Sequence, residues 1–149
     1  MHPFDIKTVL FAKHAQHVVL IHFPIALFII GVLFDFLGQW TKRRQLAAAA
    51  SCNFFVAALT TIPVLITGIL AWQWELEGQR LKSVLLMHLV LGCVSSLLIW
   101  VVWFVHARSQ RREGNVLPAY RLPIEAAAVV IVTLTGHLGG FLSGVNGPG

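Results

Sequence analysis

The chain contains few charged residues. Aspartate, glutamate, lysine and arginine make up 11% of its 149 residues, whereas soluble globular domains usually contain about 25%. Hydrophobic residues make up 57% of the chain, and the mean hydropathy is +0.78. This composition excludes an ordinary soluble enzyme and indicates a small membrane protein with one compact bundle.

Cysteine is also scarce, and both cysteines lie inside apolar segments. Cys52 and Cys93 therefore predict neither a disulfide scaffold nor a thiolate metal site. Residues 1–16 carry the charges of Asp5, Lys7 and Lys13 and lack a cleavage-type end, so we expect no removable signal peptide. The first apolar run would then serve as its own insertion signal.

Four long apolar runs fill most of the sequence. Each is long enough to cross a hydrocarbon core of about 30 Å as an α-helix that rises about 1.5 Å per residue. A backbone inside lipid must satisfy its own hydrogen bonds, which favours helices for runs of this length. Pro24 and Pro63 lie inside two of the runs and predict kinks. We therefore predict an all-α fold, a polytopic membrane protein whose single membrane domain (residues 1–149) is an up-down bundle of four transmembrane helices, at about 18–40, 46–72, 84–105 and 122–142.

The positive charges are unevenly placed along the chain. Seven of the eleven lysines and arginines fall in the loops that follow the first and third spans. By the positive-inside rule these two loops face the cytoplasm and both termini face outward. We therefore predict a multi-pass protein of the bacterial inner (cytoplasmic) membrane with periplasmic termini, and we assign the net charge of +5 to topology rather than to nucleic-acid binding. The N-terminal arm, residues 1–17, includes a predicted amphipathic helix at 4–16 on the outer surface.

Seven histidines in so apolar a chain are the main chemical signal. Polar groups within a membrane are costly and usually face the bundle interior or a cavity. Neutral imidazole is a good ligand for iron, copper and zinc. An up-down arrangement places four of the histidines at one depth near the outer surface, which predicts a metal centre there. These four are His17, His22, His88 and His137.

Glycines near two of these histidines favour heme over a bare ion. Gly92 lies on the same helical face as His88, and further glycines lie beside His137 at positions 136, 139 and 140. Small residues leave room for a flat macrocycle between helices, although they also permit close helix packing. We expect no acidic or thiolate ligand at this depth that would complete a zinc or copper site. The cofactor predicted from this pattern is heme b, with one or two molecules per chain.

His22, His88 and His137 are the predicted axial ligands of the heme iron, and His17 is the fourth cofactor-binding candidate. His17 and His22 are five residues apart, which is about 140° around an ideal helix. They cannot both point at one iron unless the helix is distorted at its start. One of them would then ligate, and the other would hydrogen-bond a heme propionate or bind quinone.

Two carboxylates lie near the predicted inner surface. Asp35 is close to the basic stretch 42–44, and Glu125 is close to Arg121. The simpler interpretation is a pair of salt bridges at the membrane interface. The alternative is a proton-handling group for quinone on the inner side.

Several motifs resemble domain-of-unknown-function family 2231. They are HVVLIHFPIAL at 17–27, the pair Thr67-Gly68, His88, and TGHLGG at 135–140. The resemblance covers about residues 14–146 and implies a bacterial four-helix membrane protein. It also implies redox chemistry, because members of this family are associated with c-type cytochrome domains and quinoprotein sugar dehydrogenases. The architecture is similar in outline to four-helix b-type cytochromes.

These observations predict a heme-binding membrane subunit for electron transfer. Its partners would be the lipid bilayer, a periplasmic dehydrogenase or c-type cytochrome, and the quinone pool. It would be an electron-transfer subunit and not a complete enzyme. Two alternatives remain open: a cofactor-free membrane anchor or assembly factor for a periplasmic redox protein, and a metal-ion binding or transport protein. The first span argues against transport, because only apolar residues and Gly31 separate the histidines from Asp35.

Overall fold

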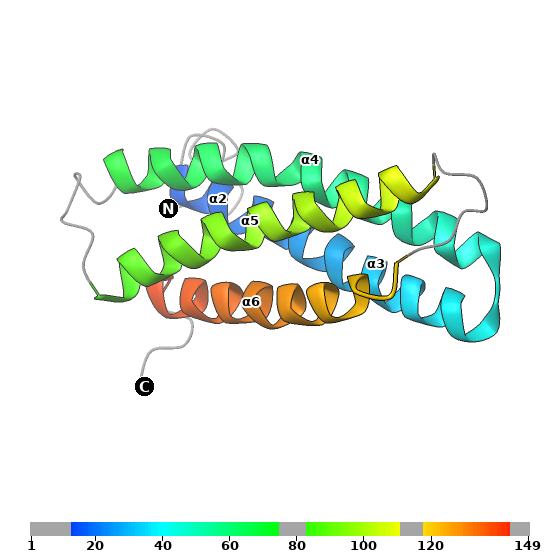
Figure 1. Cartoon of the computed structure of the whole chain (residues 1–149). Helices are drawn as coiled ribbons and strands as arrows, with labels where there is room; N and C mark the ends of the chain where they lie inside the picture. Colours follow the sequence, from blue (N-terminus) through cyan, green and yellow to red (C-terminus); the bar gives the residue numbers. More distant parts are fainter. Residues whose placement is uncertain (1–12, 75–82, 111–117, 144–149) are drawn as a thin grey trace.

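The protein is an up-and-down bundle of long helices (Figure 1). The computed structural model describes residues 13–74, 83–110 and 118–143, so the predicted amphipathic helix at 4–16 lies mostly outside the described residues. The described part contains no strand, which confirms the all-α prediction. Its helices are α2 (Lys13–Leu20), α3 (His22–Thr41), α4 (Arg44–Trp74), α5 (Ser83–Gln110) and α6 (Arg121–Leu142).

Within the described residues, four segments are long and apolar enough to cross a membrane. They are Gln16–Thr41, Arg44–Gln73, Val84–Ser109 and Arg121–Leu142, and they confirm the four predicted spans. The helix of the third span, α5, continues to Gln110, past the predicted end at 105. The extension follows from packing, because His106 and Ser109 at this end are buried against the bundle.

The first span is divided into two helices at Ile21, where α2 ends and α3 begins. Pro24 explains the division. Its ring conflicts with the carbonyl of Leu20, four residues earlier, and it has no N–H to donate to that carbonyl. The interruption is a single residue, since Ile21 keeps right-handed helical angles, and α4 continues as a helix through Pro63. The kinks at the two prolines stay predictions.

The core lies in the middle of the bundle, where small residues let the helices approach closely. Phe28 of α3 and Phe54 of α4 are fully buried, and their ring centroids are 5.6 Å apart. Gly31 admits the Phe54 ring, since a Cβ at Gly31 would lie only 2.7 Å from Cε1 of Phe54. The bundle surface exposes large apolar side chains, as expected for a lipid-facing surface. Among them are Phe23, Phe36, Trp40, Leu97, Phe104 and Val130.

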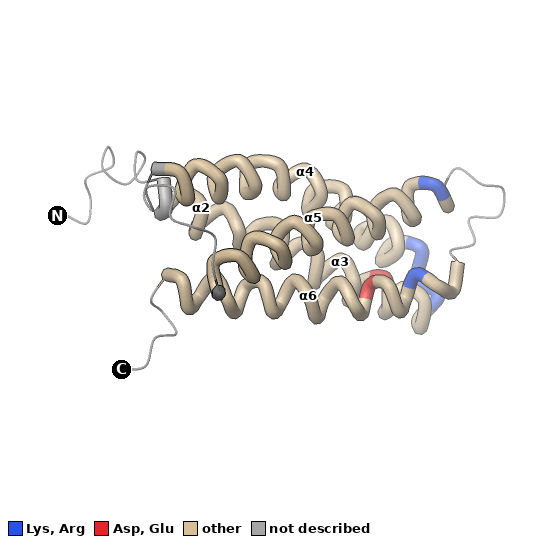
Figure 2. Tube along the Cα trace, turned by 60° about the vertical axis from the view of Figure 1, so that its left-hand side comes forward, with Lys and Arg blue, Asp and Glu red and all other residues tan. Residues whose placement is uncertain are grey.

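The basic residues gather at one end of the bundle (Figure 2). This end holds the turn between α3 and α4, the end of α5 and the start of α6. The turn is tight, and Lys42 adopts a left-handed conformation with φ of 59°. The sequence prediction assigns this end to the cytoplasm. Its described basic residues are Lys42, Arg43, Arg44, Arg108 and Arg121.

Candidate functional site

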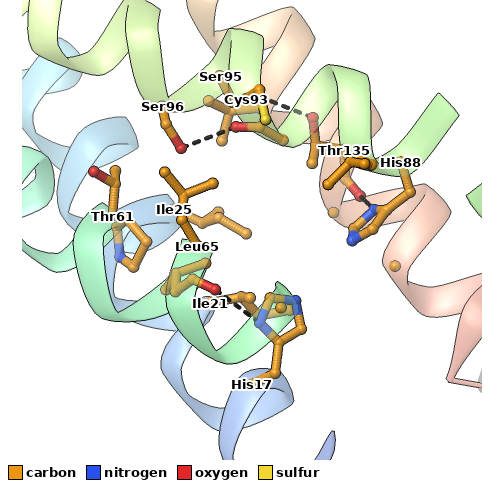
Figure 3. A pocket seen from close by; sticks show the side chains of 18 of the residues that line it. His17, Ile21, Ile25, Thr61, Leu65, His88, Cys93, Ser95, Ser96 and Thr135 are labelled. Atoms are coloured by element: carbon orange, nitrogen blue, oxygen red, sulfur yellow. Dashed lines mark hydrogen bonds between the residues drawn. The ribbon is translucent and has the colours of Figure 1, made fainter. Parts of the chain in front are cut away.

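A cavity of about 240 Å³ opens among the helices at the end of the bundle opposite the basic residues. Its lining is mainly apolar, with residues from all five helices. Two of the four candidate histidines, His17 of α2 and His88 of α5, line it. Figure 3 shows their rings on either side of open space, with Ile25 and Leu65 nearby.

The imidazole of His17 is held by α4. Its Nδ1 lies 3.1 Å from the carbonyl oxygen of Val64 and 3.2 Å from Oγ1 of Thr67. A carbonyl oxygen only accepts hydrogen bonds, so this contact places the proton of a neutral His17 on Nδ1. The lone pair of the ring is then on Nε2. Such an Nδ1–H bond to a carbonyl is the usual second partner of a metal-ligating histidine.

His88 is held in the same way by α6. Its Nδ1 lies 3.1 Å from the carbonyl oxygen of Thr135, which again places the proton on Nδ1 and the lone pair on Nε2. The hydroxyl of Thr135 donates to Ile131 and is 2.9 Å from the hydroxyl of Ser95. This network fixes the wall of the cavity that carries His88.

The two rings lie edge to face, at a centroid distance that is compatible with a shared metal. Their centroids are 6.5 Å apart, and the ring planes are at 86° to each other. Metal–imidazole bonds of about 2.0–2.1 Å put two opposed ligating nitrogens about 4 Å apart and their ring centroids a little over about 6 Å apart. The observed separation is close to that value.

Each of the two rings packs against a glycine of a neighbouring helix. A Cβ at Gly68 would lie 2.9 Å from Cε1 of His17, and a Cβ at Gly139 would lie 3.2 Å from Cε1 of His88. Gly92 makes no such contact, because the nearest side-chain atom to its Cβ position is Cγ2 of Thr135 at 3.9 Å. The glycines at 68 and 139 therefore make room for the imidazoles themselves.

His22 and His137 do not line this cavity. Both side chains are exposed. The Nδ1 of His22 donates to the carbonyl of Val18 in the preceding turn, at 2.7 Å, so this bond stays within the first span. The ring of His137 packs edge-on against Phe141 at 5.0 Å. The structure thus brings together two of the four histidines, and the sequence prediction ranked one of these two, His17, last.

The geometry of α6 explains the position of His137. Gly136 and Gly139 line the cavity, and successive residues of a helix are rotated by about 100°. His137 is therefore turned away from the face that carries its two neighbouring glycines.

A second group of functional side chains lies at the basic end of the bundle. Asp35, His106, Arg121 and Glu125 come from three helices, and their exposed fractions are 1%, 2%, 5% and 1%. His106 Nε2 is 2.9 Å from Oε1 of Glu125. Arg121 donates from Nε to Oδ2 of Asp35 at 2.8 Å. We refer to these four residues as the inner polar cluster.

The sequence predicted only part of the inner polar cluster. The expected interfacial salt bridge of Asp35 exists, but its partner is Arg121 of α6 and not the basic stretch 42–44. Glu125 bonds to His106, a histidine to which the sequence analysis assigned no role. The available signal was the spacing of Arg121 and Glu125, which puts both on one face of a helix.

The middle of the bundle separates the two sites. Thr61 accepts a hydrogen bond from Trp100 Nε1 at 3.1 Å, and Thr61 also lines the cavity. Beyond it lie the fully buried rings of Phe28 and Phe54. Phe54 then contacts His106, with ring centroids 4.7 Å apart. An apolar core therefore lies between the cavity and the inner polar cluster.

Comparison with known proteins gives one result. The sequence model of DUF2231, described as a predicted membrane protein, matches residues 13–147. No match was found among curated proteins or among solved structures.

Proposed function

The chain belongs to the DUF2231 family of predicted membrane proteins, and we propose that it is a b-type cytochrome whose heme iron is held by His17 and His88. The observation that carries the proposal is the pairing of two imidazoles from separate helices across one cavity. Each imidazole donates its Nδ1 proton to a backbone carbonyl, so the lone pair that can bind a metal is on Nε2.

The number of ligands favours heme over a bare ion. Zinc sites in proteins use three or four protein ligands. Among the described residues, no group of three potential metal ligands includes His17 or His88. Heme iron needs only one or two axial ligands from the protein, because the macrocycle fills its other positions. Two opposed histidines match that requirement.

The protonation of the rings favours a metal over quinone at this position. A quinone carbonyl accepts hydrogen bonds and needs an N–H donor. Neutral His17 and His88 keep their N–H on Nδ1, where it is already donated to Val64 and Thr135. Their Nε2 atoms are therefore acceptors, which suits a metal ion.

The cavity is small for a ligand as large as heme. Its volume of about 240 Å³ is below the roughly 300–1,000 Å³ of pockets that enclose a drug-sized ligand. The lining includes long apolar side chains such as Leu65, Leu85 and Leu89, which can change rotamer. We expect these side chains to move when heme binds, while the glycines at 68 and 139 keep their places against the ligands.

The position of the site supports an electron-transfer role. The cavity is at the end opposite the basic residues, which is the outward end by the positive-inside rule. A heme there would supply one-electron chemistry, and the chain would bind it, orient it and tune it. We propose that it exchanges electrons between a periplasmic dehydrogenase or c-type cytochrome and the quinone pool. The apolar core at Phe28 and Phe54 supports this role over ion transport.

The test is a dithionite-reduced minus air-oxidised visible spectrum of the detergent-purified chain from heme-supplied cells. We expect a sharp low-spin b-type band and one heme per chain by pyridine hemochrome. His17→Ala and His88→Ala should abolish the band, whereas the matched variants His22→Ala and His137→Ala should retain it. A flat spectrum from folded wild-type protein would reject the proposal, and loss of the band in His22→Ala or His137→Ala would reject the ligand pair.

A further inference from the structure

Three potential metal ligands of the inner polar cluster come within reach of one ion. One donor atom each from Asp35, His106 and Glu125 lies within 4.8 Å of the others. The three side chains come from α3, α5 and α6, and their exposed fractions are 1%, 2% and 1%. They are far from the cavity that contains His17 and His88, because the buried rings of Phe28 and Phe54 lie between.

One oxygen in this cluster has no partner. Among the described residues, Oε2 of Glu125 is the buried side-chain oxygen or nitrogen that makes no hydrogen bond. Burying a carboxylate oxygen without a partner is unfavourable, and such an atom in a folded protein calls for an explanation. The ion pairs of Asp35 with Arg121 and of Glu125 with His106 do not supply one.

We propose that Asp35, His106 and Glu125 bind one divalent transition-metal ion of the class of Zn²⁺, Mn²⁺ or Fe²⁺. Imidazole and carboxylate donors suit these ions. Glu125 binds through both oxygens, which gives Oε2 its partner. With Asp35 and His106, four donor atoms are then available, enough for a four-coordinate site without water.

The donors must move closer together to bind an ion. Metal–ligand bonds of about 2.0–2.2 Å in a tetrahedral site put the donors about 3.4 Å apart. The present donors lie within 4.8 Å of one another, so the most widely spaced of them must approach by up to about 1.4 Å. His106 Nε2 and Glu125 Oε1 are already 2.9 Å apart, so the ion takes the place of the proton between them.

Arg121 orients Asp35 by binding one of its two carboxylate oxygens. Its Nε donates to Oδ2, so Oδ1 is the oxygen that remains for the ion. Its terminal nitrogens donate to Oε1 of Gln39 at 2.6 Å and to the carbonyl of Pro118 at 3.3 Å. Hydrogen bonds that hold a ligating carboxylate in place are common around metal sites. The two carboxylates balance the charge of the ion, and Arg121 shares its charge with these oxygens.

A closed and buried site of this kind stabilises structure rather than performing catalysis. It connects α3, α5 and α6 at the basic end of the bundle. The ion therefore acts as a clamp between helices, at the opposite end from the cofactor site.

The experiment uses the full chain in detergent, purified without an affinity tag and stripped with a chelator. Equilibrium dialysis against Zn²⁺ with elemental analysis should give one ion per chain. Co²⁺ alone, added to protein produced without added heme, should give the visible absorption of a four-coordinate site. Glu125→Gln and His106→Gln should each weaken binding at least tenfold, whereas His88→Ala should bind as the wild type does.

If the wild-type protein takes up no stoichiometric Zn²⁺ or Co²⁺, the proposal is overturned, whatever the variants show. Unchanged affinity in Glu125→Gln and His106→Gln would also overturn it. The outcome of the metal-binding experiment is independent of the outcome of the heme experiment. The heme band should persist in Glu125→Gln if both proposals hold, and metal uptake in His88→Ala does not depend on whether heme binds.

Discussion

The imidazole of His17 faces that of His88 across the cavity, with centroids 6.5 Å apart and planes at 86°. The two residues reach this arrangement from opposite sides. His17 lies on the short helix α2, which packs against α4 and is divided from α3 near Pro24. His88 lies one turn into α5 and is held by α6. The pairing therefore depends on the packing of α2 against α4 and of α5 against α6.

The angle between the two rings leads to a spectroscopic prediction. Axial imidazoles with perpendicular planes give a highly anisotropic low-spin ferric signal in electron paramagnetic resonance, whereas parallel planes give a rhombic one. If heme binds between His17 and His88 with little change in ring orientation, oxidised protein should show the highly anisotropic signal. A rhombic signal would mean that the rings rotate on binding or that other residues are the ligands.

Gly68 and Gly92 provide a matched pair of substitutions. Alanine at Gly68 puts a Cβ 2.9 Å from Cε1 of His17, so the ring must move, and we expect at least about tenfold weaker heme retention, in the range for disturbed ligand orientation. Alanine at Gly92 meets only Thr135 at 3.9 Å but adds a methyl group to the cavity lining, so it should weaken heme retention less than Gly68→Ala does. Because alanine favours a helix over glycine by up to about 1 kcal/mol, Gly92→Ala should not be less stable. Heme retention after dilution into detergent is measured for both variants. Equal retention would show that the contact between Gly68 and His17 does not matter for heme binding.

The buried pair of Asp35 and Arg121 leads to a prediction about stability. Removing one partner leaves an unpaired buried charge, which typically costs about 3–5 kcal/mol. Asp35→Asn and Arg121→Gln should each lower the free energy of unfolding substantially. The double variant should lose clearly less than the sum of the two, because neither charge is left alone. Unfolding in mixed micelles followed by circular dichroism measures the cycle, and strictly additive losses would show that the pair is not coupled.

The orientation in the membrane can be tested at the turn between α3 and α4. A single cysteine placed by Arg43→Cys, in a chain that also carries Cys52→Ala and Cys93→Ala, should react with a membrane-impermeant maleimide only after the cells are opened. The reason is that this end carries all of the described lysines and arginines except Lys13 and is predicted to face the cytoplasm. Labelling in intact cells would reverse the orientation and place the cavity on the inner side.

The sequence by itself determined the architecture. Length and hydropathy were enough to predict four helical spans, since any segment of that kind must satisfy its backbone hydrogen bonds within itself. The proline at 24 was enough to predict an irregularity in the first span, because the lost N–H and the ring clash are local effects. The charges of the loops indicated one basic end, which the fold confirms for the described residues.

Only the tertiary structure decided which side chains meet. The sequence placed four histidines at a similar depth but ranked His22 and His137 above His17, because depth along a helix says little about direction around it. In the structure His17 packs against Gly68 of α4, whereas His137 lies away from the cavity face of α6. The inner polar cluster was likewise decided by packing, since Asp35, His106 and Glu125 are distant in sequence and meet only because three helices converge.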